Sequence, residues 1–236
     1  MLIGGLQKTT LVDFPGTVAC TVFTQGCPFR CHFCHNPELV LKSQFNPIIT
    51  EREIFDFLHD RLGKIHGVCI TGGEPLMQDD IEKFISHIKS IGFKVKLDTN
   101  GYYPEKLKSI IDSGDIDYIA MDIKAPLGKY WKVTNIQDTR NKIQTNSNNQ
   151  ISTSINLIMN SNIDYEFRTT VAKPLLGIDD LISIGETIKG AKKYYIQNYV
   201  KSKQINQKMD LKPFSDEDLA EVEKKLKKSI DLVKVR

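Results

Sequence analysis

Short apolar runs recur along the chain at intervals that suit the strands of a sheet. The run Val18 to Thr24 is typical of a buried strand, and FKVKL alternates apolar and polar positions as a half-buried strand does. Another apolar run is closed at once by Gly72 and Gly73. The pattern predicts six strands, at 18–24, 68–70, 93–97, 118–121, 165–171 and 194–199.

Helical spacing of apolar residues separates these runs. Thr50 and Glu53 have the spacing of a capping box, and Ser215 with Asp218 is a second helix-start signal near the end of the chain. Residues 135–150 are rich in Asn and Gln, which favours a frayed helix and a surface loop. Helices are predicted at 50–62, 79–91, 104–111, 152–159, 181–188 and about 215–230.

The repeated succession of strand and helix predicts the fold class. Six such units favour a parallel α/β sheet, either doubly wound or curled toward a barrel. The chain has 236 residues, 40% of them hydrophobic, which is enough to build a core. No composition change marks a domain boundary, so we expect a single domain over residues 1–236.

The charged and terminal residues argue against two classes of partner. The chain has 32 Lys and Arg against 29 Asp and Glu, a net charge of +3, which is too mild to favour a nucleic-acid partner. Its first residues lack the basic stretch followed by an apolar stretch that is typical of a signal peptide, and no apolar run approaches membrane-spanning length. We therefore expect a soluble, cytoplasmic protein without a nucleic-acid or membrane partner.

Three of the five cysteines lie close together in FTQGCPFRCHFCHN, as Cys27, Cys31 and Cys34. In a reducing compartment such clustered thiols favour metal binding or catalysis over disulfides. Three thiolates would suit a 4Fe–4S cluster in which one iron has no protein ligand. A zinc site completed by His32 or His35, or plain buried cysteines, are the other interpretations of the same motif.

Polar residues follow the later strands at the points where these strands end. TGGEP follows the second strand, with glycines that let the backbone approach a ligand and a carboxylate that can receive an ammonium group. DTNG follows the third strand. The carboxyl ends of parallel strands share one rim, where α/β folds build their active sites, and the cysteine loop leaves the first strand at the same rim. We expect these polar residues to meet there: Gly72, Gly73, Glu74, Asp98, Thr99, Asp122, Lys124 and Arg168.

These motifs together resemble the radical S-adenosylmethionine (radical SAM) enzymes, and within them the activating enzymes of glycyl-radical proteins. FTQGCPFRCHFCHN is similar to the cluster loop of the family, and TGGEP, LDTNG and MDIK match further family motifs in the expected order. The resemblance runs over most of the chain. The layout GGLQKTTLVDFPG, with EFRTTV later, is most similar to the activating proteins of anaerobic ribonucleoside-triphosphate reductase.

The resemblance implies a partial (β/α)6 TIM-like barrel, with a parallel sheet and the cluster loop after the first strand. It implies that Cys27, Cys31 and Cys34 hold one 4Fe–4S cluster, and that S-adenosylmethionine chelates the fourth iron through its amino and carboxylate groups. The remaining Cys20 and Cys69 lie in apolar strands, where we expect core residues and no second cluster.

The resemblance also assigns residues to the parts of S-adenosylmethionine. Gly72, Gly73 and Glu74 would receive its amino group, and Phe33 and His35 would lie near the adenosine.

On the other side of the ligand, Asp122 and Lys124, with Arg168, would meet the methionine carboxylate and the ribose. Some relatives use a monovalent cation, and the positions that match its site are Asp98, Thr99, Met121 and Asp122.

The activity implied by the resemblance is reductive cleavage of S-adenosylmethionine to methionine and a 5′-deoxyadenosyl radical. That radical would remove a hydrogen from a glycine Cα of a partner, with anaerobic ribonucleoside-triphosphate reductase as the expected partner and flavodoxin or ferredoxin as the type of electron donor. The alternatives are a pyruvate formate-lyase-type activase and a radical SAM enzyme that acts on a small molecule. A non-catalytic iron–sulfur or zinc-binding protein is the alternative of another class, and the series of motifs argues against it because an electron carrier needs no rim for an organic ligand.

Overall fold

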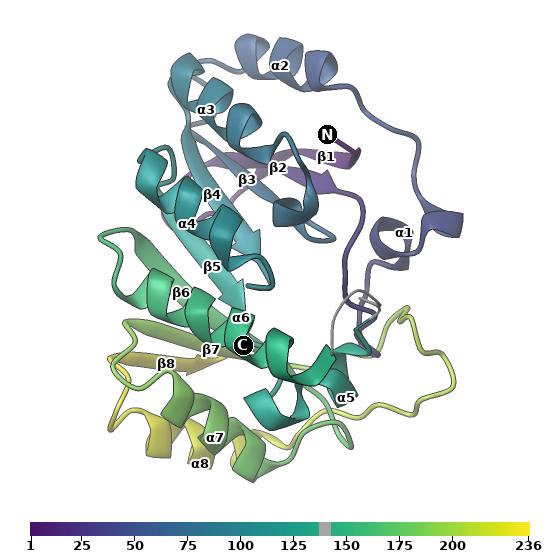
Figure 1. The fold of residues 1–236 in the computed structure, drawn as a ribbon, viewed down its shortest axis with the longest axis vertical. Coiled ribbons are helices and arrows are strands. Elements are labelled where there is room, and N and C mark those ends of the chain that lie inside the picture. The colour runs from purple at the N-terminus through teal and green to yellow at the C-terminus, as the bar shows by residue number, and fades with distance from the viewer. Residues whose placement is uncertain (137–142) are drawn as a thin grey trace.

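The computed structural model describes residues 1–136 and 143–236, which contain a curved eight-stranded sheet (Figure 1). The strands lie in the sheet in the order of the sequence. The first is antiparallel to the second, and every other neighbouring pair is parallel. The strands are β1 (Ile3–Thr10), β2 (Ala19–Thr24), β3 (Gly67–Gly72), β4 (Lys94–Thr99), β5 (Tyr118–Asp122), β6 (Asp164–Val171), β7 (Lys193–Asn198) and β8 (Leu232–Val235).

Each parallel pair of strands is joined by a segment that contains at least one helix. Figure 1 shows α2, α3, α4, α7 and α8 along the outer side of the curved sheet, whereas α1 lies across its open side. The edge strands β1 and β8 do not pair with each other, so the barrel stays open. The helices are α1 (Pro37–Val40), α2 (Glu51–Asp60), α3 (Ile81–Ile91), α4 (Pro104–Ser113), α5 (Tyr130–Thr134), α6 (Ile143–Met159), α7 (Ile178–Thr187) and α8 (Asp216–Leu226).

The predicted parallel α/β sheet is confirmed, and the six predicted strands correspond to β2 through β7. The capping box is present at the start of α2, where Thr50 Oγ1 accepts from the Glu53 N–H and the Glu53 carboxylate accepts from the Thr50 N–H. Ser215 caps α8 by accepting from the Asp218 N–H.

Two strands of the sheet were not predicted. β1, IGGLQKTT, has β-branched residues only at its two ends, with two glycines between them, so its sequence carries little strand signal, and its pairing with β2 creates the strand. β8 has four residues and pairs with β7. The last helix was predicted to continue to about residue 230, which is wrong, because α8 ends at Leu226 and the chain turns into β8.

α6 is longer than the helix predicted at 152–159. It begins at Ile143, and its buried residues Ile151, Ile155 and Ile158 have the spacing of one helix face. This packing stabilises the helix, which includes part of the polar stretch for which the sequence favoured a frayed helix and a loop. The surface loop predicted within residues 135–150 falls in part on 137–142, which lie outside the described residues.

The two faces of the sheet differ in polarity, and this difference positions the site. Leu97, Ile119 and Phe167 are completely buried, whereas charged residues flank Leu97 on β4 and Phe167 on β6, and Asp122 ends β5. Lys96 is only 1% exposed. Because side chains alternate along a strand, charges from β4, β5 and β6 gather on the inner face of the open barrel. No helix among the residues described here is both long and apolar enough to cross a membrane.

Candidate active site

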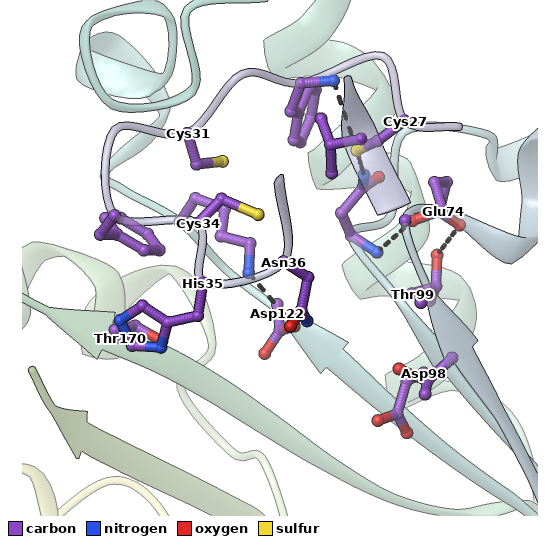
Figure 2. A pocket seen from close by; sticks show the side chains of 18 residues that line it. Cys27, Cys31, Cys34, His35, Asn36, Glu74, Asp98, Thr99, Asp122 and Thr170 are labelled. Carbon is purple, nitrogen blue, oxygen red and sulfur yellow. Dashed lines mark hydrogen bonds and ion pairs between the residues drawn. The ribbon is translucent and has the colours of Figure 1, made fainter. Parts of the chain in front are cut away.

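A cavity of about 230 Å³ lies between the loop that follows β2 and the carboxyl ends of β3 to β6. One wall is the cluster loop, residues 25–36, which leaves β2 and leads into α1. Figure 2 shows side chains from this loop and from the strand ends facing one common space. All predicted site residues except Arg168 line it, namely Cys27, Cys31, Phe33, Cys34, His35, Gly72, Gly73, Glu74, Asp98, Thr99, Asp122 and Lys124.

Other residues that line the cavity were not predicted. Asn36 and Asn100 lie inside the motifs CHN and DTNG, so the same motifs could have indicated them. Thr170 lies two residues after Arg168 on β6, and the alternation of a strand places it on the same face. Phe29, Val40 and Thr71 also line the cavity, and they carried no comparable signal.

The cluster loop is held in place from several sides. The Arg30 side chain donates to the carbonyls of Cys27 and Phe29, at 2.7 and 2.8 Å, and its backbone N–H donates to Thr134 of α5. The segment that follows β7 holds the other end, since the Ile205 N–H donates to the Cys34 carbonyl. These contacts fix the cluster loop, so its three thiols lie in defined positions along one wall of the cavity.

The three sulfur atoms of the cluster loop face the cavity (Figure 2). Burial raises the pKa of Cys31 to about 12, although Lys124 opposes the rise, and burial also raises the pKa values of Cys27 and Cys34. The three thiols are therefore neutral as they stand, and binding of a metal would displace their protons. In the described parts of the chain no three His, Cys, Asp or Glu side chains lie close enough together to hold a single metal ion as they stand.

The two glycines of TGGEP allow β3 to end against the cluster loop. Gly72 has a φ of +124°, and a Cβ there would lie 2.3 Å from backbone atoms of Thr24. A Cβ on Gly73 would lie 2.1 Å from the Gly26 carbonyl oxygen. The Gly73 and Glu74 N–H groups donate to the carbonyls of Thr24 and Gly26, both at 2.8 Å. The close approach of these two backbone segments is by itself enough to require glycine at both positions.

Glu74 is a fully buried carboxylate that links two of the motifs. It accepts from Thr99 Oγ1 at 2.8 Å, from the Asn100 N–H at 2.7 Å and from the Leu76 N–H at 3.1 Å (Figure 2). Burial raises the pKa of Glu74 to about 7, against the opposing effect of these hydrogen bonds. A carboxylate with such a pKa gains stabilisation from a positively charged ligand group.

Asp122 lies between two positively charged side chains. Arg168 Nε donates to Asp122 Oδ1 at 3.0 Å, and Lys124 Nζ lies 3.2 Å from Asp122 Oδ2. Burial alone would raise the pKa of Asp122, but Arg168 and Lys124 outweigh it and lower the pKa to about 2. Asp122 is therefore ionised at neutral pH. Lys124 lines the cavity and places a positive charge at its wall.

His35 has a ring nitrogen without a partner in the described structure. Its Nε2 atom is buried and makes no hydrogen bond, while the ring lies 5.8 Å from that of Tyr199. Burial lowers the pKa of His35, so the ring is neutral at pH 7. A buried polar atom of this kind is costly unless a ligand satisfies it, and His35 lines the cavity.

The arrangement suits a thiophilic metal group beside an organic ligand that carries one positive and one negative charge. Three thiols face a carboxylate, an ammonium group and an unpartnered imidazole nitrogen across one cavity. The volume of about 230 Å³ lies below the roughly 300 Å³ at which sites for organic ligands usually begin.

A comparison with protein families identifies the chemistry of this site. Residues 21–170 match the model of the radical SAM superfamily, and this range contains the cluster loop and the strand ends that line the cavity.

Two relatives narrow the comparison. The chain is 31% identical over 240 residues to a protein of Methanocaldococcus jannaschii that is assigned as a glycyl-radical enzyme activating enzyme, covering 100% of this chain and 95% of the relative. It is 33% identical over 139 residues to the pyruvate formate-lyase-activating enzyme of Listeria monocytogenes. That match covers 52% of each chain, so it spans about half the length of this relative.

The fold also resembles that of a solved structure, SuiB of Streptococcus suis bound to S-adenosylmethionine. The TM-score is 0.68 at 12% sequence identity, and the match covers 90% of this chain and 48% of SuiB. This chain thus spans about half the length of SuiB, and the likeness concerns the fold.

Proposed function

Because the chain belongs to the radical SAM superfamily and, within it, to the glycyl-radical enzyme activating enzymes, we propose that it generates a glycyl radical on anaerobic ribonucleoside-triphosphate reductase. The observation that carries this proposal is the cavity, where three thiols of one loop meet the polar ends of neighbouring strands. A non-catalytic electron carrier would need the thiols but not the strand ends.

The residues of the cavity fit a 4Fe–4S cluster and S-adenosylmethionine. Cys27, Cys31 and Cys34 would hold three irons through their thiolates and leave the fourth open to the ligand. When bound, these groups supply the one-electron cleavage of a sulfonium that leads to removal of a hydrogen atom from glycine. A flavodoxin- or ferredoxin-type protein would deliver the electron.

The protein's own side chains orient the ligand and exclude water. Glu74 would accept from the amino group of S-adenosylmethionine, and Lys124 would bind its carboxylate, since each carries the complementary charge at the cavity wall. Phe33 and His35 would lie against the adenosine, where the unpartnered His35 Nε2 can bond a polar atom of the ligand. Asp122 keeps Lys124 charged and in place.

The open barrel supports a protein substrate rather than a metabolite. β1 and β8 leave the sheet unclosed, and a protein loop can present a glycine through such an opening. Glycine suits the reaction because its Cα is reached without hindrance from a side chain. Anaerobic ribonucleoside-triphosphate reductase is favoured by the layout GGLQKTTLVDFPG with the later EFRTTV. The similarity to pyruvate formate-lyase-activating enzymes makes pyruvate formate-lyase the second candidate.

The proposal is tested by electron paramagnetic resonance. The reduced, cluster-loaded protein is mixed without oxygen with S-adenosylmethionine and either candidate partner, and the spectrum is recorded. We expect a glycyl-radical doublet with the reductase, and its loss when the radical glycine of the reductase is changed to alanine. A doublet with pyruvate formate-lyase alone would keep the activity and replace the partner. Cleavage of S-adenosylmethionine without a doublet on either protein would contradict a glycyl-radical activase of these two enzymes.

A further inference from the structure

Six charged side chains gather on the inner face of the barrel, next to the cavity. They come from three neighbouring strands and the residues that follow them, and each is at most one quarter exposed. Asp122 and Arg168 are paired in register across β5 and β6, so their side chains leave the sheet on the same face. The six are Lys96, Asp98, Asp122, Lys124, Glu166 and Arg168.

Arg168 bridges the two carboxylates nearest the cavity. Its Nη2 atom lies 3.1 Å from Asp98 Oδ2 and 3.4 Å from Asp122 Oδ2, while Nε donates to Asp122 Oδ1 at 3.0 Å. The planar guanidinium thus spans from the end of β4 to the end of β5. Each carboxylate also has a lysine partner, Lys96 for Asp98 and Lys124 for Asp122.

The charges in this group balance. Lys96, Lys124 and Arg168 carry three positive charges, and Asp98, Asp122 and Glu166 carry three negative ones. A metal cation added between the carboxylates would leave an excess positive charge in a buried place, which is costly. The low pKa of Asp122, which Arg168 and Lys124 cause, agrees with a carboxylate that already has its counter-ions.

Of the four residues that match the monovalent-cation site of some relatives, Asp98, Thr99 and Asp122 line the cavity, but the space between the two carboxylates is taken by Arg168. Asp98 and Asp122 are occupied by Arg168, and Met121 is not among the cavity residues. Its side chain extends to Gly101 instead, where an added Cβ would lie 2.1 Å from Met121 Cε. Neighbouring residues of a strand point to opposite faces, so Met121 and Asp122 cannot both face one ion through their side chains.

We infer that Arg168 takes the place of a monovalent cation in this protein: it is a positioning residue that holds Asp98 and Asp122 in register, so that neither the fold nor ligand binding requires Na⁺ or K⁺. Arg168 acts through these carboxylates and through Lys124, which Asp122 orients toward the cavity. A guanidinium supplies its charge permanently and in fixed geometry, whereas a bound ion exchanges with solvent.

The test compares the parent with Arg168→Met, which removes the charge and keeps an unbranched side chain. Thermal unfolding of the cluster-free proteins is measured in choline chloride, NaCl and KCl at equal ionic strength. The parent should unfold at the same temperature in all three salts. Arg168→Met should unfold about 6 to 20 °C lower in choline chloride, because a buried charge network loses its centre, and NaCl or KCl should restore at least half of the loss.

Two controls separate this effect from general salt effects. Arg52→Met removes an exposed arginine that pairs with Asp56 on α2, and it should respond equally to the three salts. Arg168→Lys keeps one positive charge, and it should respond to Na⁺ and K⁺ less than Arg168→Met does. Stabilisation of the parent by NaCl or KCl over choline chloride, or an Arg168→Met variant that does not respond to metal cations, would overturn the inference.

A second readout rests on the proposed function. The affinity of the cluster-loaded parent for S-adenosylmethionine should be the same in the three salts, and that of Arg168→Met should rise when Na⁺ or K⁺ replaces choline. An increase of about tenfold for the parent would overturn the inference. If the parent binds no S-adenosylmethionine in any salt, the proposed function fails, while the thermal measurement on the cluster-free protein still decides the role of Arg168.

Discussion

Glu74 connects two strand ends at the site, but its ionised form lowers the stability of the fold. Its carboxylate joins the end of β3 to Thr99 and Asn100 at the end of β4, yet burial raises its pKa to about 7 from an ordinary value of 4.5. Folding therefore favours the protonated form, and the cost of holding the ionised form reaches about 3 kcal/mol above pH 7.

The pH dependence of stability should reveal this cost. A raised pKa means that the contribution of Glu74 is fully favourable below about pH 4.5 and is lost as the pH rises through about 7. We predict that the stability of Glu74→Gln relative to the parent increases between pH 5 and pH 8, because glutamine does not titrate. Urea unfolding of the cluster-free proteins at both values measures it. Glu105→Gln, an exposed carboxylate at the start of α4, is the control, and an equal response of the two variants would contradict the assignment.

The cysteines allow a second prediction at the scale of residues. Cys27, Cys31 and Cys34 face the cavity, whereas Cys20 is fully buried in β2 and Cys69 contacts Lys96 and Asp98 on the inner face. After anaerobic reconstitution we expect about four irons and four sulfides for one cubane, with loss of the visible absorbance in each alanine variant of the first three.

The remaining two cysteines are the matched controls. Cys20→Ala and Cys69→Ala should retain the cluster, because neither lines the cavity. Retention of the full iron content by Cys27→Ala, or binding of a single zinc with no iron–sulfur absorbance, would rule out the proposed ligand set.

At the scale of elements, the contact between the end of β3 and the cluster loop decides the geometry of the site. Backbone hydrogen bonds from Gly73 and Glu74 to Thr24 and Gly26 fix the loop relative to the sheet. Arg30 and the segment after β7 hold its other parts. The thiols are therefore positioned by contacts that come from three separate parts of the chain.

Gly73→Ala should break this contact. The new Cβ would lie 2.1 Å from the Gly26 carbonyl oxygen, and backbone atoms can yield only if β3 and the loop separate. We predict a loss of about 1–3 kcal/mol in unfolding free energy, with reduced cluster content, measured by urea unfolding and iron analysis. Gly128→Ala is the control, because nothing lies within 4 Å of its added Cβ and its stability should change by less than about 0.5 kcal/mol. Equal behaviour of the two variants would refute the packing argument.

For the whole molecule, an open sheet of eight strands puts the ends of four strands and one loop around a single cavity while leaving a side of the barrel free. The antiparallel β1 and the short β8 extend the six predicted strands at both edges without closing them. This architecture meets both demands of the proposed activity, a protected place for the cofactor and an entrance for a partner loop.

The sequence by itself determined the features that depend on neighbours along the chain. Cysteine spacing, the apolar periods of β2 to β7 and the motifs at the strand ends are local patterns, and parallel strands bring their ends to one rim by geometry. For the same reason twelve of the thirteen predicted site residues could be placed at the cavity before the fold was known.

Only the tertiary structure decided what depends on contacts between distant segments. The sequence predicts that Arg168 binds the ligand. In the folded protein the register of β6 beside β5 places its guanidinium against Asp122 and Asp98. The sequence predicts that the glycines of TGGEP contact a ligand, and the structure adds that the chain around Thr24 and Gly26, some fifty residues earlier, packs against them. β1 has a weak local strand propensity and β8 has only four residues, so both depend on the hydrogen bonds that the neighbouring strands supply, and these partners appear only in the folded protein.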